Sequence, residues 1–102
     1  MNPKYTVIWE RKALEEFKSI LTYLKIQSFN ASRIVKFRML DRVELLKSNP
    51  RIVEADKLKN DPNVNFHAFV VFSYRLTYQI LEEEKLIRIL RIRHTSKEPL
   101  NY

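Results

Sequence analysis

The spacing of apolar residues predicts a short strand followed by a helix at the start of the chain. β-Branched and aromatic residues fill the run from Lys4 to Trp9, which is typical of a strand. From Glu10 the apolar residues recur every three or four positions up to about Gln27, which predicts an amphipathic helix. The expected core-facing side of this helix carries Leu14, Phe17, Leu21 and Leu24.

A second helix is predicted after a short connection in which Asn30 is a candidate N-cap. It ends near Asn49, because Pro50 disfavours helical backbone in the residue before it. Its apolar stripe consists of Ala31, Val35, Met39, Val43 and Leu46, and is widened by Ile34, Phe37 and Leu40. We therefore expect this helix to be covered over much of its surface. The short connection predicts that the two helices form an antiparallel hairpin.

Three strands are predicted in the second half of the chain, after a polar loop from Arg51 to Asn65. That loop is long for a compact domain, and loops of such length are often functional or mobile. The strands are Phe66 to Phe72, which is apolar nearly throughout, then Ser73 to Glu82 and Lys85 to Arg93. Because only short turns separate them, they are expected to form an antiparallel meander.

The middle strand of the three alternates between apolar and polar side chains. One face carries Tyr74, Leu76, Tyr78 and Ile80, and the other carries Arg75, Thr77 and Gln79. The order strand, helix, helix, strand, strand, strand predicts an α+β fold, with the helical hairpin packed on one face of a four-stranded sheet. We expect residues 1–102 to form a single domain, with Arg75 on the uncovered face of the sheet. The pattern does not identify the neighbour of the first strand.

Composition and charge narrow the classes of function. The 102 residues carry a net charge of +7, with a pI of about 9.8, which favours a nucleic acid, a ribosome or an acidic protein as partner. Glycine is absent, which excludes glycine-rich phosphate-binding loops. With no cysteine and only two histidines, we expect neither a metal site nor a cofactor. Since the chain shows no signal sequence and no long apolar run, we expect a cytoplasmic protein without membrane contact.

Positive charge is concentrated in the C-terminal segment from Lys85 to Tyr102. It holds five Lys or Arg residues against one acid, Glu98, which is typical of a surface that binds a polyanion, although a solvated strand face gives the same pattern. The candidate nucleic-acid contacts are Arg91, Arg93 and Lys97, with Lys57 and Lys59 of the long loop as weaker candidates. The two strand arginines are predicted to share one face, with Ile87 and Ile89 behind them.

Three side chains are candidates for catalysis. Arg75 is suited to bind a phosphate and neutralise its charge, unless it pairs with the acidic turn Glu82 to Glu84. His94 can exchange a proton at neutral pH, although a histidine at a strand end more often bonds a neighbouring loop. Tyr102 could stack on a base or carry a proton, although a terminal tyrosine more often covers core surface. His67 is expected to be buried or edge-facing rather than catalytic.

Several motifs resemble the RelE/ParE superfamily of toxins from type II toxin–antitoxin systems. The most specific are Y-R-x-x-Y from Tyr74 to Tyr78 and I-x-I-L-R-x-x-H from Ile87 to His94. The opening strand, the run from Ala13 to Leu24 and L-x-x-N-P from Leu46 to Pro50 are also similar. The resemblance spans nearly the whole chain and implies two helices packed on an antiparallel sheet.

The superfamily implies two alternative activities. RelE-like members cut mRNA in the ribosomal A site through attack by the message's own 2′-hydroxyl, and there Arg75 would stabilise charge while His94 and Tyr102 transfer protons. ParE-like members poison DNA gyrase instead. The strand Phe66 to Phe72 lacks the paired lysines of RelE-like members, which weighs against strong nuclease activity.

Either activity implies a cognate antitoxin, because a free toxin would arrest its host. The net charge of +7 suits an acidic, partly disordered antitoxin that folds when it binds. Such a segment is expected to lay an amphipathic helix, or to add a strand, across the sheet and the helical hairpin. A third alternative is a basic nucleic-acid-binding module without catalysis.

Overall fold

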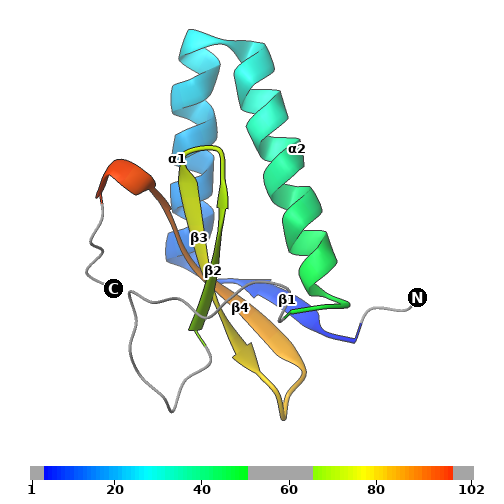
Figure 1. Cartoon of the computed structure of the whole chain (residues 1–102). Helices are drawn as coiled ribbons and strands as arrows, with labels where there is room; N and C mark the ends of the chain where they lie inside the picture. The colour runs from blue at the N-terminus through cyan, green and yellow to red at the C-terminus, as the bar shows by residue number, and fades with distance from the viewer. Residues whose placement is uncertain (1–3, 51–65, 98–102) are drawn as a thin grey trace.

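The computed structural model describes residues 4–50 and 66–97, and its elements follow the expected order (Figure 1). They are β1 (Thr6–Trp9), α1 (Arg11–Gln27), α2 (Phe29–Leu46), β2 (Phe66–Val71), β3 (Tyr74–Leu81), β4 (Leu86–His94) and the short 3-10 helix η1 (Thr95–Lys97). The predicted α+β fold, with the helical hairpin against one face of the sheet, is confirmed. The predicted loop from Arg51 to Asn65 lies outside the described residues.

β1 lies at one edge of the sheet, beside the last strand of the chain. The strand order is β1-β4-β3-β2, and β1 runs parallel to β4. The other three strands form the predicted antiparallel meander, so the sheet is mixed. A parallel pair needs a long connection, which the helical hairpin and the following strands provide. β1 pairs only with Leu86 to Ile89, so the second half of β4 is a sheet edge.

The core lies between the helices and one face of the sheet. All four apolar residues that the alternation of β3 predicts for it are buried: Tyr74, Leu76, Tyr78 and Ile80. The helices bury Val35, Met39, Val43 and Leu46 of α2, together with Ala13 and Phe17 of α1. The sequence also places Leu14 in the core, and this is wrong, because Leu14 is 38% exposed. Consecutive helical residues point roughly 100° apart, so the fully buried Ala13 turns Leu14 to the flank of α1.

The N-cap of α2 is Ser28 rather than the predicted Asn30. The Ser28 backbone is extended, and its Oγ accepts a 3.2 Å hydrogen bond from the backbone N–H of Ala31. The N–H of Ser28 donates a 2.8 Å hydrogen bond to the carbonyl of Leu24. One extended residue therefore both ends α1 and begins α2, which makes the hairpin tip tighter than expected.

The predicted cover over the outer side of α2 is wrong for the part of the chain that the structure describes. Ile34 is 52% exposed, Phe37 is 60% exposed and Leu40 is 38% exposed. They lie on sides of α2 that do not face the sheet, because the buried stripe takes the opposite side. Neither described helix is long and apolar enough to cross a membrane.

A β-bulge in β4 decides which side chains share a face. Thr77 and Tyr78 of β3 pair with Arg91 and Ile89, so Leu90 is an extra residue in β4. Strict alternation would put Ile89 and Arg91 on the same face. The extra residue changes the phase, so that Ile89 is fully buried and the arginines that follow it lie on the opposite face.

Tyr78→Phe is expected to lower the free energy of unfolding by about 1–2 kcal/mol. The fully buried Tyr78 donates a 2.6 Å hydrogen bond from its hydroxyl to the carbonyl oxygen of Pro50, so the variant leaves a buried acceptor without this donor. Urea unfolding followed by circular dichroism measures the change. Tyr23→Phe is the control, because Tyr23 is 59% exposed and its variant should stay within about 0.5 kcal/mol of the unmodified chain. Equal losses in both variants would contradict the role of this hydrogen bond.

Candidate functional site

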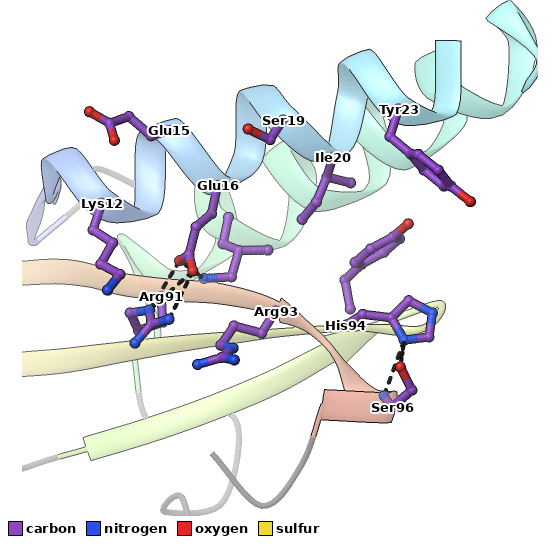
Figure 2. A pocket seen from close by; sticks show the side chains of 12 residues that line it. Lys12, Glu15, Glu16, Ser19, Ile20, Tyr23, Arg91, Arg93, His94 and Ser96 are labelled. Atoms are coloured by element: carbon purple, nitrogen blue, oxygen red, sulfur yellow. Dashed lines mark hydrogen bonds and ion pairs between the residues drawn. The ribbon is translucent and has the colours of Figure 1, made fainter. Parts of the chain in front are cut away.

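An open groove of about 680 Å³ runs between α1 and the second half of β4 (Figure 2). It exists because β1 stops pairing at Ile89, so α1 faces an open strand edge beyond that residue. We call it the β4 groove. It is lined by Lys12, Glu15, Glu16, Ser19, Ile20, Tyr23, Tyr74, Arg91, Ile92, Arg93, His94 and Ser96.

Two of the predicted site arginines face each other across β3 and β4. Arg75 pairs in register with Arg93, and Tyr74 pairs with His94. Both arginines lie on the sheet face that the helices leave uncovered, and both are half-buried. Like charges directly opposite each other in a sheet repel, and an anion held between them relieves that repulsion. This end of the sheet is therefore suited to bind a phosphate.

The alternative role of Arg75, an ion pair with the turn after β3, is not what the structure shows. That turn lies at the other end of β3, and seven residues of a strand span roughly 23 Å. Glu82 instead accepts a 2.9 Å hydrogen bond from the hydroxyl of Tyr5 and lies 3.5 Å from Nζ of Lys85. Arg75 thus lies beside Arg93 on the uncovered face of the sheet rather than at the acidic turn.

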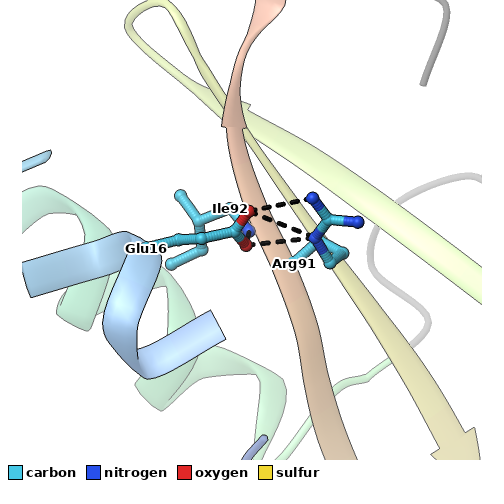
Figure 3. Close-up of polar contacts among 3 residues, drawn as sticks. All are labelled: Glu16, Arg91 and Ile92. Atoms are coloured by element: carbon cyan, nitrogen blue, oxygen red, sulfur yellow. Dashed lines mark hydrogen bonds and ion pairs between the residues drawn. The ribbon is translucent and has the colours of Figure 1, made fainter. Parts of the chain in front are cut away.

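Glu16 of α1 joins the helix to the open edge of β4 (Figure 3). Its Oε1 accepts a 3.0 Å hydrogen bond from the backbone N–H of Ile92, and its Oε2 accepts one of 3.0 Å from the Arg91 guanidinium. The side chains of Arg91 and Glu16 are only 14% and 21% exposed. Arg91, a predicted nucleic-acid contact, is therefore held in a largely buried ion pair in the wall of the groove.

Ser96 holds the ring of His94 at the end of β4 (Figure 2). The backbone N–H of Ser96 donates a 3.1 Å hydrogen bond to Nδ1, and the Ser96 hydroxyl lies 2.8 Å from the same nitrogen. Because a backbone amide can only donate, we assign the proton of the neutral ring to Nε2. Tyr74 supports the ring edge-on, with 5.4 Å between the ring centroids. His94 therefore offers an N–H at the groove.

Burial raises the pKa of the Tyr74 hydroxyl, and the neighbouring Tyr23 raises it further. Tyr74 therefore stays protonated at neutral pH and can donate a hydrogen bond, but it is poorly suited to act as a base. Tyr23 comes from α1 and is 59% exposed, so its ring is available to a ligand in the groove (Figure 2).

The remaining candidates are placed elsewhere or lie beyond the described residues. Lys97 is in η1, directly after the groove. Lys57, Lys59 and Tyr102 lie outside the described residues, so their predicted roles stay predictions. His67 is buried, as expected, and stacks on Tyr78 with 5.5 Å between the ring centroids. Within residues 4–50 and 66–97, no group of three His, Cys, Asp or Glu side chains could hold a metal ion.

Sequence reasoning missed the contribution of α1 to this site. Residues of its polar side line the groove, among them Lys12, Glu15, Glu16, Ser19 and Tyr23. The helical period identified that side as polar but gave no sign of which strand it faces. Ser96 was also missed, and its position two residues after His94 was the available signal.

Solved toxin structures share this fold. A chain of the chromosomal ParDE toxin–antitoxin system from P. aeruginosa is 17% identical, with a TM-score of 0.68, and the match covers 89% of this chain and 96% of that chain. The archaeal RelE–RelB complex from Pyrococcus horikoshii OT3 gives 18% identity, a TM-score of 0.64, and coverage of 92% and 98%. A mutant of the E. coli toxin RelE in the free state is 22% identical, with a TM-score of 0.62, and the match covers 93% of this chain and 87% of that chain.

Sequence identities of 17–22% to these structures show a shared fold but do not establish the family. A family model does. No curated protein sequence matches the chain. The family model described as the ParE toxin of the type II toxin–antitoxin system parDE matches residues 7–99, which is most of the chain. The chain therefore belongs to the ParE toxin family of type II toxin–antitoxin systems, within the RelE/ParE superfamily.

Proposed function

We propose that this toxin arrests growth by cutting mRNA on the ribosome, with the 2′-hydroxyl of the message as nucleophile. The observation that carries the proposal is the register of β3 and β4, which sets Arg75 opposite Arg93 and places His94 at the same end. Such a cut needs cations beside the scissile phosphate and a proton donor for the leaving oxygen. The three side chains are suited to these tasks, with Arg75 and Arg93 on the uncovered face at this end of the sheet and His94 on the side of the β4 groove.

In the proposed reaction the 2′-oxygen bonds to phosphorus and the bond from phosphorus to the 5′-oxygen breaks, which leaves a 2′,3′-cyclic phosphate. Arg75 and Arg93 hold the non-bridging oxygens, where negative charge develops. His94 donates the proton on Nε2 to the 5′-oxygen as that oxygen leaves. Tyr102 is assigned the transfer of the 2′-hydroxyl proton on the strength of the family resemblance. Binding of the message backbone is assigned to Lys57, Lys59 and Lys97.

The test is a cell-free translation reaction with purified toxin, in which primer extension maps the mRNA ends. New ends within codons, on translated messages only, are the expected result. Ends that also appear without ribosomes would contradict the ribosome-dependent step. Intact message with blocked protein output would point to arrest without cutting, and would overturn the nuclease proposal.

Inhibition of DNA gyrase is the second candidate, and one feature of β2 favours it. On the uncovered face of the sheet, β2 presents Phe66, Ala68 and Val70, where RelE-like members place paired lysines. A phosphate bound there would find fewer cations than in a RelE-like site. A supercoiling assay with purified gyrase distinguishes the two: loss of supercoiling with intact mRNA supports gyrase, and normal supercoiling removes it.

We also propose a cognate antitoxin that covers the β4 groove. Solved structures similar to this chain include complexes of RelE with RelB. The net charge of +7 suits an acidic antitoxin. The open edge of β4 beyond Ile89 and the apolar centre of the groove give such a segment both backbone and side-chain contacts.

A further inference from the structure

One aromatic side chain of the β4 groove has no role in the proposed reaction. Tyr23 comes from α1, lines the groove and is 59% exposed. Figure 2 shows its ring directed from α1 toward the end of the groove at which His94 lies. In the part of the chain that the structure describes, no hydrogen bond or ring contact engages the Tyr23 side chain. Its ring is therefore available to a substrate that reaches His94.

Tyr74 links Tyr23 to His94. The Tyr74 ring meets the His94 ring edge-on, with 5.4 Å between the centroids. Its hydroxyl is close enough to Tyr23 for that side chain to raise its pKa, in addition to the effect of burial. A group that approaches His94 through the groove therefore comes within reach of the Tyr23 ring.

The groove lining is nearly balanced in charge, unlike the pair of arginines on the uncovered face of the sheet. It holds the cations Lys12, Arg91 and Arg93 and the acids Glu15 and Glu16. Glu16 and Arg91 neutralise each other in their ion pair. Because concentrated positive charge holds phosphates, the inside of this groove suits an uncharged group better than a phosphate.

The positions of His94 and the two arginines give the message a direction in the site. In the proposed reaction Arg75 and Arg93 hold the non-bridging oxygens from the uncovered face, and His94 protonates the 5′-oxygen from the side of the β4 groove. The attacking and leaving oxygens lie on opposite sides of phosphorus, so the attacking 2′-hydroxyl lies away from the groove. The nucleotide that enters the groove is therefore the one on the 3′ side of the cut.

We propose that Tyr23 forms a subsite of the β4 groove that stacks on the base of the nucleotide on the 3′ side of the cut. The inference rests on the proposed function and adds to it a base contact and a strand direction. Aromatic rings are a general means of holding unpaired bases, and every base has a face that can stack. Ser19 lies one helical turn before Tyr23 and lines the same groove, with a hydroxyl that can donate or accept a hydrogen bond. The subsite therefore accepts all four bases.

The test combines Tyr23→Ala with a message that lacks one base. Ribosomes stalled on a synthetic message are mixed with purified toxin, and the rate of cleavage is measured at one mapped cut. Tyr23→Ala is expected to slow this cut roughly 10- to 100-fold on the intact message. Removal of the base on the 3′ side should slow the unmodified toxin by a similar factor. It should slow Tyr23→Ala by less than about threefold, because the stacking is already lost.

Removal of the base on the 5′ side of the cut is the matched control for the message, and it should slow both toxins by the same factor. Tyr23→Phe keeps the ring and should cut within about threefold of the unmodified toxin. Phe37→Ala removes a ring of matching exposure, 60%, from α2 outside the groove, and should also cut within about threefold. Tyr23→Ala should keep its thermal midpoint, because the ring that it removes is exposed.

Three results would overturn the subsite and leave the nuclease function in place. They are normal cleavage by Tyr23→Ala, an undiminished further loss for Tyr23→Ala on the message without the 3′ base, and coupling to the 5′ base instead. No cleavage by the unmodified toxin would overturn the proposed function and this inference with it. The failure of the subsite is thus distinguishable from the failure of the proposed function.

Discussion

Replacing Arg75 and His94 together by alanine is expected to slow mRNA cleavage by roughly 10³-fold or more and to abolish growth arrest. The variant removes a cation that stabilises the charged phosphorane and the donor that protonates the leaving oxygen. Each single substitution should cost nearly as much as the pair, because groups that act in one step are not additive. Primer extension in cell-free translation gives the rate, and induced expression in cells gives the growth phenotype.

The control for this pair is Arg88→Ala, which also removes a β4 arginine. Arg88 lies on the same uncovered face but pairs with Glu10 at the other end of the strand, away from the β4 groove. We expect it to retain cleavage within about threefold, in line with the small effect of most surface substitutions. Arg75→Ala with His94→Ala should keep its thermal midpoint. Cleavage within tenfold of the unmodified chain would remove Arg75 and His94 from the catalytic role.

Glu16→Ala is expected to destabilise the fold by about 2–3 kcal/mol and to lower the thermal midpoint by roughly 10–20 °C. The variant leaves the Arg91 guanidinium without its carboxylate and the N–H of Ile92 without an acceptor. A fully buried pair broken on one side costs more, about 3–5 kcal/mol, and the residual exposure of 14% and 21% reduces that figure. Differential scanning calorimetry measures the change.

Two further variants make the test specific. Glu15→Ala lies one residue earlier on the exposed side of α1 and should stay within about 0.5 kcal/mol. Glu16→Gln keeps an acceptor for Ile92 and loses only the charge, so its loss should fall between the other two. If Glu16→Ala were as stable as Glu15→Ala, the contact would not hold α1 to the edge of β4.

The spacing of apolar residues predicted the architecture well for elements that have one distinctly apolar face. The strict alternation of β3 separated Tyr78 from Arg75 correctly, and the four main core residues of α2 are buried as its period indicates. The errors fall where two elements meet. Asn30 is not the cap, because Ser28 serves both helices, and Leu14 misses the core because Ala13 takes the inward position.

The candidate site was predicted in its strand half and missed in its helix half. The motifs of β3 and β4 identified Arg75, Arg93 and His94, and the register then brought them to one end of the sheet. Glu16 lies some 75 residues before its partner Arg91, and no local signal connects residues at that separation. Nothing in the sequence separates Arg91 from Arg93, and only the position of α1 shows that Arg91 is held in an ion pair with Glu16.

The sequence by itself determined the order and type of the elements, the apolar faces, the positive charge and the membership of a toxin family, because these depend on residue type and short spacing. The tertiary structure alone decided that β1 lies parallel to β4, that a bulge at Leu90 reverses the faces of that strand, and that the outer side of α2 stays uncovered. The physical reason is that strand neighbours, registers and helix–edge contacts are set by packing between distant segments, which no local period encodes.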